Sequence, residues 1–450
     1  MLYGKCYTRW KNIWTDGIFG VITGDALGSS VQFEERAAVA KHPVTDMREN
    51  ETFHLPAGSW TDDSSLTLAL LDSICKTDRL DLRHIMNCFV DWLDYGAYTP
   101  YGYAYDIGTG TMQAINAYKQ GQDPYQCGSK SKQNNGNGSL MRIMPACLYC
   151  YEQGMEDNEA IQAIHEVGSL THAHIRPNIA CGLYYFMVKA IVSGKGVSFK
   201  DRLQEGMDLG FAYYEKALQD HENLAYYDRL RDLSAFAQVP AEKISSSGYV
   251  VDTLEAAVWA VVNTDSYESA LLKAVNLGND SDTVGAVAGG LAGLGYGCGG
   301  FWGIPDKWIE ALQKHAWIGA LCETVNDRLD KRVADGEPCI GFSMEDAEKA
   351  YSHMDKQFLK DYGDACGKNS LYTWDDGHRL LLRCRNCGGY ILLQLSEFHG
   401  MEDDSYYADF FPVSGPKEAQ LINEKYDGEK IEEAFPKRWM IGDHHPHWNM

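Results

Sequence analysis

Residues 276–283 read Asn-Leu-Gly-Asn-Asp-Ser-Asp-Thr and lead directly into Val284–Trp302, an uncharged run of 19 residues. Eight of those 19 residues are glycine, which favours a buried helix that packs closely against its neighbours over a membrane span. An earlier stretch, Trp60–Ser64, reads Trp-Thr-Asp-Asp-Ser and also precedes an apolar, helix-like run. Two carboxylates and a threonine hydroxyl therefore stand at the start of each of two predicted core helices.

Four carboxylates from two distant segments repel one another unless a positive charge lies between them. Oxygen-only ligand sets suit Mg²⁺, Mn²⁺ or Ca²⁺ better than zinc. Asp and Thr before an apolar run are also common helix N-caps, and each cluster alone fits that simpler interpretation. Capping needs one side chain per helix, however, whereas each of these helices begins with three or four. The repeated cluster therefore favours a metal site, with room for two ions, if the fold brings both segments together.

Composition limits the classes of function. The chain has 450 residues, 45% of them hydrophobic, and 40 Lys and Arg against 63 Asp and Glu give a formal net charge of -23. This charge disfavours a general role on nucleic acid or an anionic membrane. The 13 cysteines are scattered without framework spacing, and Met1–Trp14 lacks the apolar core of a signal peptide. These features predict a cytoplasmic protein with reduced thiols.

Helical periodicity dominates from Asp16 to about residue 350, and the polar, glycine-rich segments fall between the predicted helices. The pattern changes near residues 352–370, after which two apolar runs, 379–384 and 390–395, predict a β-hairpin and Lys417–Tyr426 a short helix. We therefore predict an all-α domain over residues 1–355 and a small α+β domain over residues 365–450.

Four further segments carry residues suited to chemistry. Gly24–Gly28 is a glycine-flanked turn with a carboxylate, and Asp106–Thr111 offers a carboxylate followed by hydroxyls. Asn135–Arg142 is a glycine-rich loop suited to holding a phosphate on backbone amides. Thr171-His172 contributes an imidazole. Each is weak alone, because a glycine-rich loop is usually a turn and a single histidine is usually structural.

Together and in this order, the segments closely resemble the motifs of the ADP-ribosylglycohydrolase family, including its dinitrogenase-reductase-activating bacterial branch, over Asp16–Asp306. The resemblance implies an all-α orthogonal bundle with a centre of two Mg²⁺ or Mn²⁺ ions. The metal ligands that it implies are Thr61, Asp62, Asp63, Asp280, Asp282 and Thr283. The substrate-binding residues that it implies are Gly108, Asn137, Gly138, Ser139, Met141, His172 and Gly278.

The family hydrolyses the glycosidic bond between ADP-ribose and a protein side chain, and we favour an arginine linkage over a serine linkage here. The resemblance leaves either Asp106 or Asp282 as the carboxylate that takes a proton from water. Gln32 stands where many relatives carry Glu, and Asn279 replaces a usual Gly. These departures predict altered gating or substrate preference, and a stiffer ligand loop or an added amide contact.

Two alternatives stay open. A non-enzymatic immunity protein would occlude the active site of an ADP-ribosylating toxin, a role to which hydrolysis of the modification would also contribute. Another dinuclear hydrolase would act on nucleotide-like substrates. The C-terminal segment faintly resembles immunity-type modules, and Cys384 and Cys387 have half of a zinc-site spacing, for which two reduced cysteines are the favoured interpretation. The expected partners are an ADP-ribosylated protein and, for immunity, the toxin itself.

Overall fold

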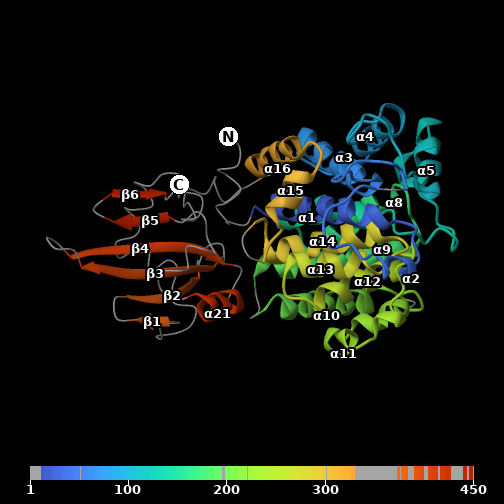
Figure 1. Cartoon of the computed structure of the whole chain (residues 1–450). Coiled ribbons are helices and arrows are strands. Elements are labelled where there is room, and N and C mark those ends of the chain that lie inside the picture. The colour runs from blue at the N-terminus through green and yellow to red at the C-terminus, as the bar shows by residue number, and fades with distance from the viewer. Residues whose placement is uncertain are drawn as a thin grey trace.

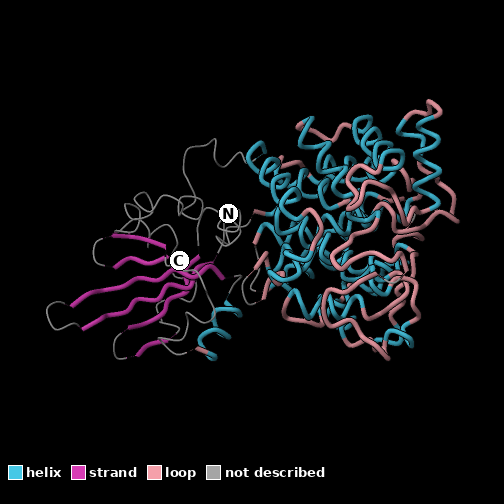
Figure 2. The backbone as a smooth tube through the Cα atoms, turned by 45° about the horizontal axis from the view of Figure 1, so that its top comes forward, coloured by secondary structure: helices cyan, strands magenta, loops and turns pink. Residues whose placement is uncertain are grey.

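The computed structural model describes residues 12–329 apart from 51, 195–197, 220 and 300–301, together with seven C-terminal segments: 372–374, 377–383, 390–399, 404–413, 416–426, 439–442 and 445–448. Helices and strands occupy separate parts of the chain (Figures 1 and 2). The described residues before 330 confirm the predicted all-α bundle. The predicted domain boundaries near residues 355 and 365, and Cys384 and Cys387, lie outside the described residues.

Helices and short 3-10 turns build the first part of the chain. In chain order they are α1 (Ile13–Gly28), η1 (Ser29–Val31), α2 (Arg36–Val39), α3 (Asp62–Thr77), α4 (Leu82–Tyr95), α5 (Thr109–Lys119), α6 (Pro124–Cys127), η2 (Leu140–Arg142), α7 (Met144–Glu152), α8 (Asp157–Ser169), α9 (Ile175–Ser193), α10 (Phe199–Ala217), η3 (Ala225–Leu230), α11 (Leu233–Ala237), η4 (Ala241–Lys243), α12 (Val250–Val262), α13 (Tyr267–Val275), α14 (Ser281–Tyr296), α15 (Asp306–Ala311) and α16 (His315–Leu329).

Helices α1 and α14 pack along their length through small residues spaced four apart. A Cβ atom added to Gly24 would lie 2.1 Å from the carbonyl oxygen of Gly285, and one added to Gly20 would lie 2.3 Å from that of Gly289. Every residue of α14 is buried. The glycine-rich run is therefore a core helix, as predicted, and glycine is required because the two backbones are in contact.

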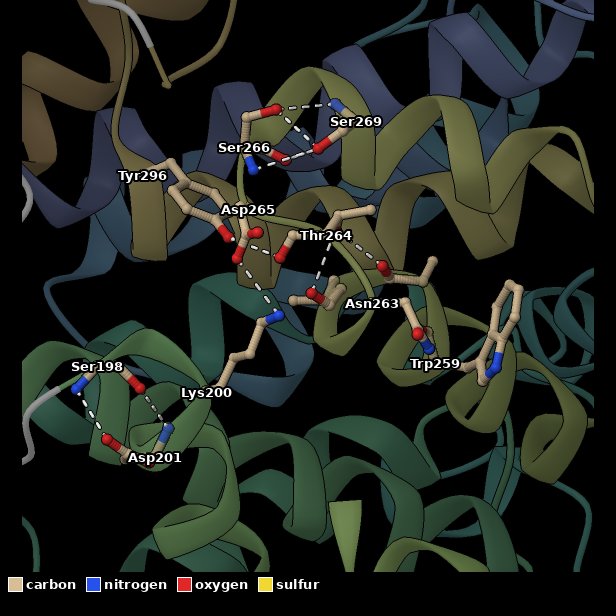
Figure 3. Close-up of polar contacts among 12 residues, drawn as sticks. Ser198, Lys200, Asp201, Trp259, Asn263, Thr264, Asp265, Ser266, Ser269 and Tyr296 are labelled. Atoms are coloured by element: carbon tan, nitrogen blue, oxygen red, sulfur yellow. Dashed lines mark hydrogen bonds and ion pairs between the residues drawn. The ribbon is translucent and has the colours of Figure 1, made fainter. Parts of the chain in front are cut away.

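Polar contacts join the loop between α12 and α13 to α10 and to the end of α14 (Figure 3). The N-terminus of α13 carries a capping box between Ser266 and Ser269. Lys200 near the start of α10 lies 3.3 Å from Asp265, and the Tyr296 hydroxyl at the end of α14 donates to the carbonyl of Thr264 at 3.3 Å. The loop between α12 and α13 thus anchors the C-terminal end of the core helix.

The C-terminal segments form a six-stranded antiparallel sheet in the order β1-β2-β3-β4-β5-β6. Its elements are β1 (Tyr372–Trp374), β2 (Gly377–Arg383), β3 (Tyr390–His399), β4 (Asp404–Val413), α21 (Pro416–Lys425), β5 (Trp439–Gly442) and β6 (His445–Trp448). The predicted hairpin corresponds to β2 and β3, and the predicted helix to α21. Buried Arg379 joins them, because its guanidinium donates to Gln394 at 2.8 Å and to the carbonyl of Tyr426 at 2.8 Å.

The sequence also predicts reduced thiols and disfavours a membrane span. Cys75, Cys88, Cys127, Cys147, Cys150 and Cys181 are buried free thiols, and Cys298 and Cys322 are also buried. Among the described helices, none combines the length and the apolarity needed to cross a membrane.

Candidate active site at the N-termini of α3 and α14

Asp25 of α1 caps α3 from outside that helix. Its carboxylate accepts hydrogen bonds from the backbone amides of Thr61 and Ser64, both at 3.0 Å, and from the Ser64 hydroxyl at 2.5 Å. The Thr61 side chain makes no capping bond to α3, a helix that is described throughout. Asp25 therefore satisfies the Ser64 amide of the first turn, which the side chain of the N-cap residue Thr61 would otherwise satisfy.

At the start of α14, too, the side chain of the N-cap residue does not cap its own helix. Asp280 occupies the N-cap position, yet its side chain makes no capping bond to this fully described helix. Its Oδ2 atom instead accepts from the Asn137 amide at 2.5 Å. The N-cap interpretation of the two clusters is therefore wrong for Thr61 and Asp280, although both residues stand at helix starts.

The fold brings the two clusters together. The Thr61 hydroxyl lies 3.4 Å from Oδ2 of Asp282, and the Thr283 hydroxyl lies 3.4 Å from Oδ1 of Asp63. Two segments separated by more than 200 residues thus share one buried site. Asp62 is also buried in the first turn of α3 and faces the same group of charges.

Burial and mutual repulsion oppose ionisation of these carboxyls. Burial, and then the neighbouring carboxylates, raise the pKa values of Asp62, Asp63 and Asp282 well above the usual range. Burial raises the pKa of Asp25 and of Asp280 to about 6, while hydrogen bonds from Ser64 and Asn137 act in the opposite direction. In the described structure, Oδ2 of Asp63 and Oδ1 of Asp282 have no hydrogen-bond partner.

These observations fit a divalent cation. Buried carboxylate oxygens without donors are costly, and a hard cation would satisfy them and offset the repulsion. No group of three or more His, Cys, Asp or Glu side chains in the described part of the chain is already arranged to hold a metal ion. The Thr61 and Thr283 hydroxyls lie at hydrogen-bonding distance from carboxylates of the opposite cluster.

Asp106 and Gln32 border the carboxylate cluster. Asp106 has a left-handed backbone with a φ of 53°, and its Oδ2 accepts from the Gln32 amide at 2.5 Å. Burial raises the pKa of Asp106, while hydrogen bonds with Gln32 and Asp282 lower it. The sequence singled out Gln32 only as a departure from its relatives, and its contact with Asp106 gives it a place in the site. Gly108 follows as the N-cap of α5.

The glycine-rich loop lies against α12 and the imidazole. The Asn137 backbone amide donates to the carbonyl of Gly248 at 3.1 Å, and its side chain also donates to Thr253 at 2.9 Å. A Cβ atom on Gly138 would lie 2.6 Å from the ring of His172, so the loop backbone rests on that ring. Burial, and then Arg142, lower the pKa of His172 to about 3, which leaves the imidazole neutral.

The remaining predicted substrate residues are Ser139 and Met141, and both side chains are buried. The Ser139 hydroxyl accepts from the Cys181 thiol at 3.6 Å. Arg142 is fully buried and donates to the carbonyl of Gly138, which supports the loop from behind. These side chains shape the loop, and its backbone amides are the groups that suit a phosphate.

Gly278 and Asn279 hold the loop before Asp280 through backbone contacts. Both have left-handed φ angles, 70° and 58°, and the Asn279 amide donates to the carbonyl of Glu34 at 2.7 Å. The Asn279 side chain donates to Ser246 at 3.0 Å, which is the added amide contact expected from this substitution. Arg36 supports the same loop, because its guanidinium donates to the carbonyl of Leu277 at 3.0 Å. No local pattern in the sequence marks Arg36 for this role.

The ADP-ribosylglycohydrolase family model matches residues 10–336, a range that contains both carboxylate clusters. The chain belongs to the ADP-ribosylglycohydrolase family. The chain is 30% identical over 311 residues to the ADP-ribosylarginine hydrolase Tri1 of Serratia proteamaculans (strain 568). The alignment covers 68% of this chain and 76% of the relative. The chain is 29% identical over 297 residues to the ADP-ribosyl-[dinitrogen reductase] glycohydrolase of Rhodospirillum rubrum, covering 65% of this chain and 87% of the relative.

A solved structure agrees with this assignment. The chain matches an ADP-ribosylglycohydrolase-related protein complex with a TM-score of 0.56 and 28% sequence identity, covering 71% of this chain and 100% of that chain. The family match ends at residue 336, so the strands β1–β6 and helix α21 lie beyond it.

Proposed function

We propose that this chain is a metal-dependent hydrolase that removes ADP-ribose from a modified protein side chain, with arginine favoured over serine. The observation that carries the proposal is the meeting of the two Asp/Thr clusters at the N-termini of α3 and α14, with two carboxylate oxygens left unsatisfied. The names of the relatives support arginine, because Tri1 is an ADP-ribosylarginine hydrolase in two bacteria.

The six residues that would hold two Mg²⁺ or Mn²⁺ ions are those of the two clusters: Thr61, Asp62, Asp63, Asp280, Asp282 and Thr283. When bound, such ions would lower the pKa of a bound water and bind ribose oxygens. The chain's own residues position what reacts. Asn137 fixes Asp280 by donating to it, and Asp25 caps α3 in place of the Thr61 side chain.

Asp106 is the residue we favour for accepting the proton of the attacking water. It adjoins Asp282 but lies outside the two helix-start clusters, and the Gln32 amide orients its carboxyl. The backbone amides of Gly138 and Ser139 would donate to the diphosphate, with neutral His172 packed beneath the loop. Cleavage at the anomeric carbon passes through an oxocarbenium-like transition state, which nearby carboxylates stabilise.

An immunity protein that only occludes a toxin would not need this cluster. Burying several like charges is unfavourable, so a plug would be more stable without them. The cluster therefore favours catalysis, and reversing a toxin's modification would itself give protection.

The test is release of ADP-ribose from proteins modified on arginine or on serine, with Mg²⁺ or with EDTA. We expect release from the arginine-modified protein with Mg²⁺, and loss of release in EDTA and in Asp282→Asn. Circular dichroism would establish that the variant is folded. Equal release by wild type and Asp282→Asn would contradict the assignment of the site.

A further inference from the structure

Four aromatic rings form a continuous strip that leads away from the carboxylate cluster. The centroid distances are 5.4 Å for Phe53–Tyr105, 5.9 Å for Tyr105–Tyr103 and 6.4 Å for Tyr103–Tyr101. We call these four residues the aromatic strip. Each step is within the range of favourable aromatic contact.

The inner end of the strip touches both loops of the candidate active site. Tyr105 directly precedes Asp106, and its hydroxyl donates to the carbonyl of Trp60, the residue before Thr61. Phe53 reaches the same place from another loop, because the hydroxyl of its neighbour Thr52 donates to the carbonyl of Gln32 at 3.4 Å. The strip therefore begins where the substrate bond would be cleaved.

The outer end of the strip is exposed. The Tyr103 side chain is 52% exposed and Tyr101 is 36% exposed, although a 2.7 Å hydrogen bond with Ser59 fixes the Tyr101 hydroxyl. Exposed rings gain little for folding, so a row of them beside a site suggests binding.

Phe33 is another exposed ring, on the loop that carries Gln32. It is 62% exposed and follows Gln32. Its φ of 68° is unfavourable for a bulky residue, and a 2.7 Å hydrogen bond from its amide to the carbonyl of Asn279 holds it there. A strained and exposed phenylalanine is common at ligand sites and is hard to explain by packing.

The chemistry of the strip favours a planar cation. Ring faces attract guanidinium groups. Residues 98–108, which contain three of the four rings, include no Lys or Arg, and Lys314, which reaches this loop, donates to the backbone carbonyl of Thr99 at 2.7 Å. The chain's own arginines lie over other rings, such as Arg142 over Phe89 and Arg176 over Tyr226.

We propose that the aromatic strip binds the guanidinium of the ADP-ribosylated arginine, a proposal that rests on the hydrolase function proposed above. An ADP-ribosylated arginine remains a planar cation, whereas a serine linkage offers no charge to a ring face. The strip thereby selects the arginine linkage. The ADP-ribose itself would occupy the glycine-rich loop and the carboxylate cluster, away from Tyr103.

The test uses the full chain with Mg²⁺, one peptide carrying ADP-ribosylarginine and a matched peptide carrying ADP-ribosylserine. For Tyr103→Ala we expect the KM for the arginine peptide to rise about 3- to 30-fold, the range spanned by exposed and desolvated cation–π contacts. Tyr103→Phe keeps the ring face and should restore the wild-type KM. Trp317→Ala removes an exposed ring from α16, outside the strip, and serves as the matched control.

Calorimetry with free ADP-ribose distinguishes a contact with the guanidinium from a contact with adenine or ribose. The proposal expects Tyr103→Ala to bind ADP-ribose as wild type does, because free ADP-ribose has no guanidinium. An equal loss of ADP-ribose affinity would show that the ring contacts adenine or ribose and would overturn the proposal, as would an unchanged KM. Wild-type preference for the serine peptide would overturn it while leaving the hydrolase function intact. No release from either peptide would instead refute the hydrolase function itself.

Discussion

Removing divalent cations should make the stability of the helical bundle fall as the pH rises. Burial raises the pKa of Asp25 and of Asp280 from 3.8 to about 6. Between these two pH values the folded state binds more protons than the unfolded chain, so the free energy of unfolding decreases as the pH rises from 3.8 through 6. The still higher pKa values of Asp62, Asp63 and Asp282 extend this decrease above pH 6.

The magnitude follows from the pKa shifts. A shift of about two units corresponds to ~3 kcal/mol for one carboxyl. The carboxyls share one cluster and titrate together, so their contributions do not add, and we expect a total on the order of 3–6 kcal/mol. Magnesium at 100 times its Kd would contribute ~2.7 kcal/mol. For a bundle of roughly 320 residues, whose unfolding entropy is ~0.7 kcal/mol/K, this raises Tm by ~4 °C.

Thermal melts followed by circular dichroism would measure both effects. The EDTA-treated protein should melt at a lower temperature at pH 8 than at pH 6, and Mg²⁺ should raise Tm more at pH 8, where fewer protons compete. Asp282→Asn removes one charge, so it should weaken the pH dependence and abolish the Mg²⁺ effect. Asp208→Asn, at an exposed position on α10, is the charge-matched control. If Asp282→Asn keeps the wild-type pH dependence and Mg²⁺ shift, the reasoning from a buried, repelling cluster is refuted.

Three further predictions test the rest of the site. Gly24→Ala should destabilise the bundle by at least ~1–3 kcal/mol in urea unfolding, because its Cβ would lie 2.1 Å from a backbone oxygen. Gly319→Ala is the control and should be neutral or stabilising, because its Cβ would meet its nearest neighbour only at 3.9 Å. Equal effects of the two substitutions would contradict the close packing of α1 and α14. Asp62→Asn should abolish hydrolysis and leave the circular dichroism spectrum unchanged, and near wild-type turnover would remove Asp62 from the ligand set. A chain truncated near residue 355 should still hydrolyse a small ADP-ribosylated peptide but lose recognition of a specific protein partner, as measured by activity and pull-down; an insoluble product would mean that the C-terminal segments complete the helical core.

The sequence predicts the local features of the site, but it does not show which distant residues contact them. Two Asp/Thr clusters before apolar runs are visible in the sequence because helix starts and core helices are local patterns. The sequence does not decide between capping and metal binding, because that depends on whether another residue caps the helix. Asp25 does so for α3 across 36 positions of the chain, a contact that no local pattern reveals.

Two other long-range contacts also cannot be predicted from local sequence patterns. Gln32 reaches Asp106 across 74 positions, and Arg36 reaches the carbonyl of Leu277 across 241. Each depends on how loops meet after the helices have packed. The sequence marked Gln32 because it departs from related sequences, but only the structure shows that its amide orients a carboxyl of the site.

The glycines of α1 and α14 connect the fold to the chemistry. Backbone contact between these helices leaves no room for side chains at their interface, and Asp25, next to Gly24 on α1, reaches the first turn of α3. The same contact places the start of α14 beside α3, where Asp282 meets Thr61. The glycines of the α1–α14 interface therefore help to determine where the charged side chains converge. The uncharged run after residue 283 and the acidic cluster before it act as one structural unit, in which the packing of the helix places the carboxylates of the cluster beside α3.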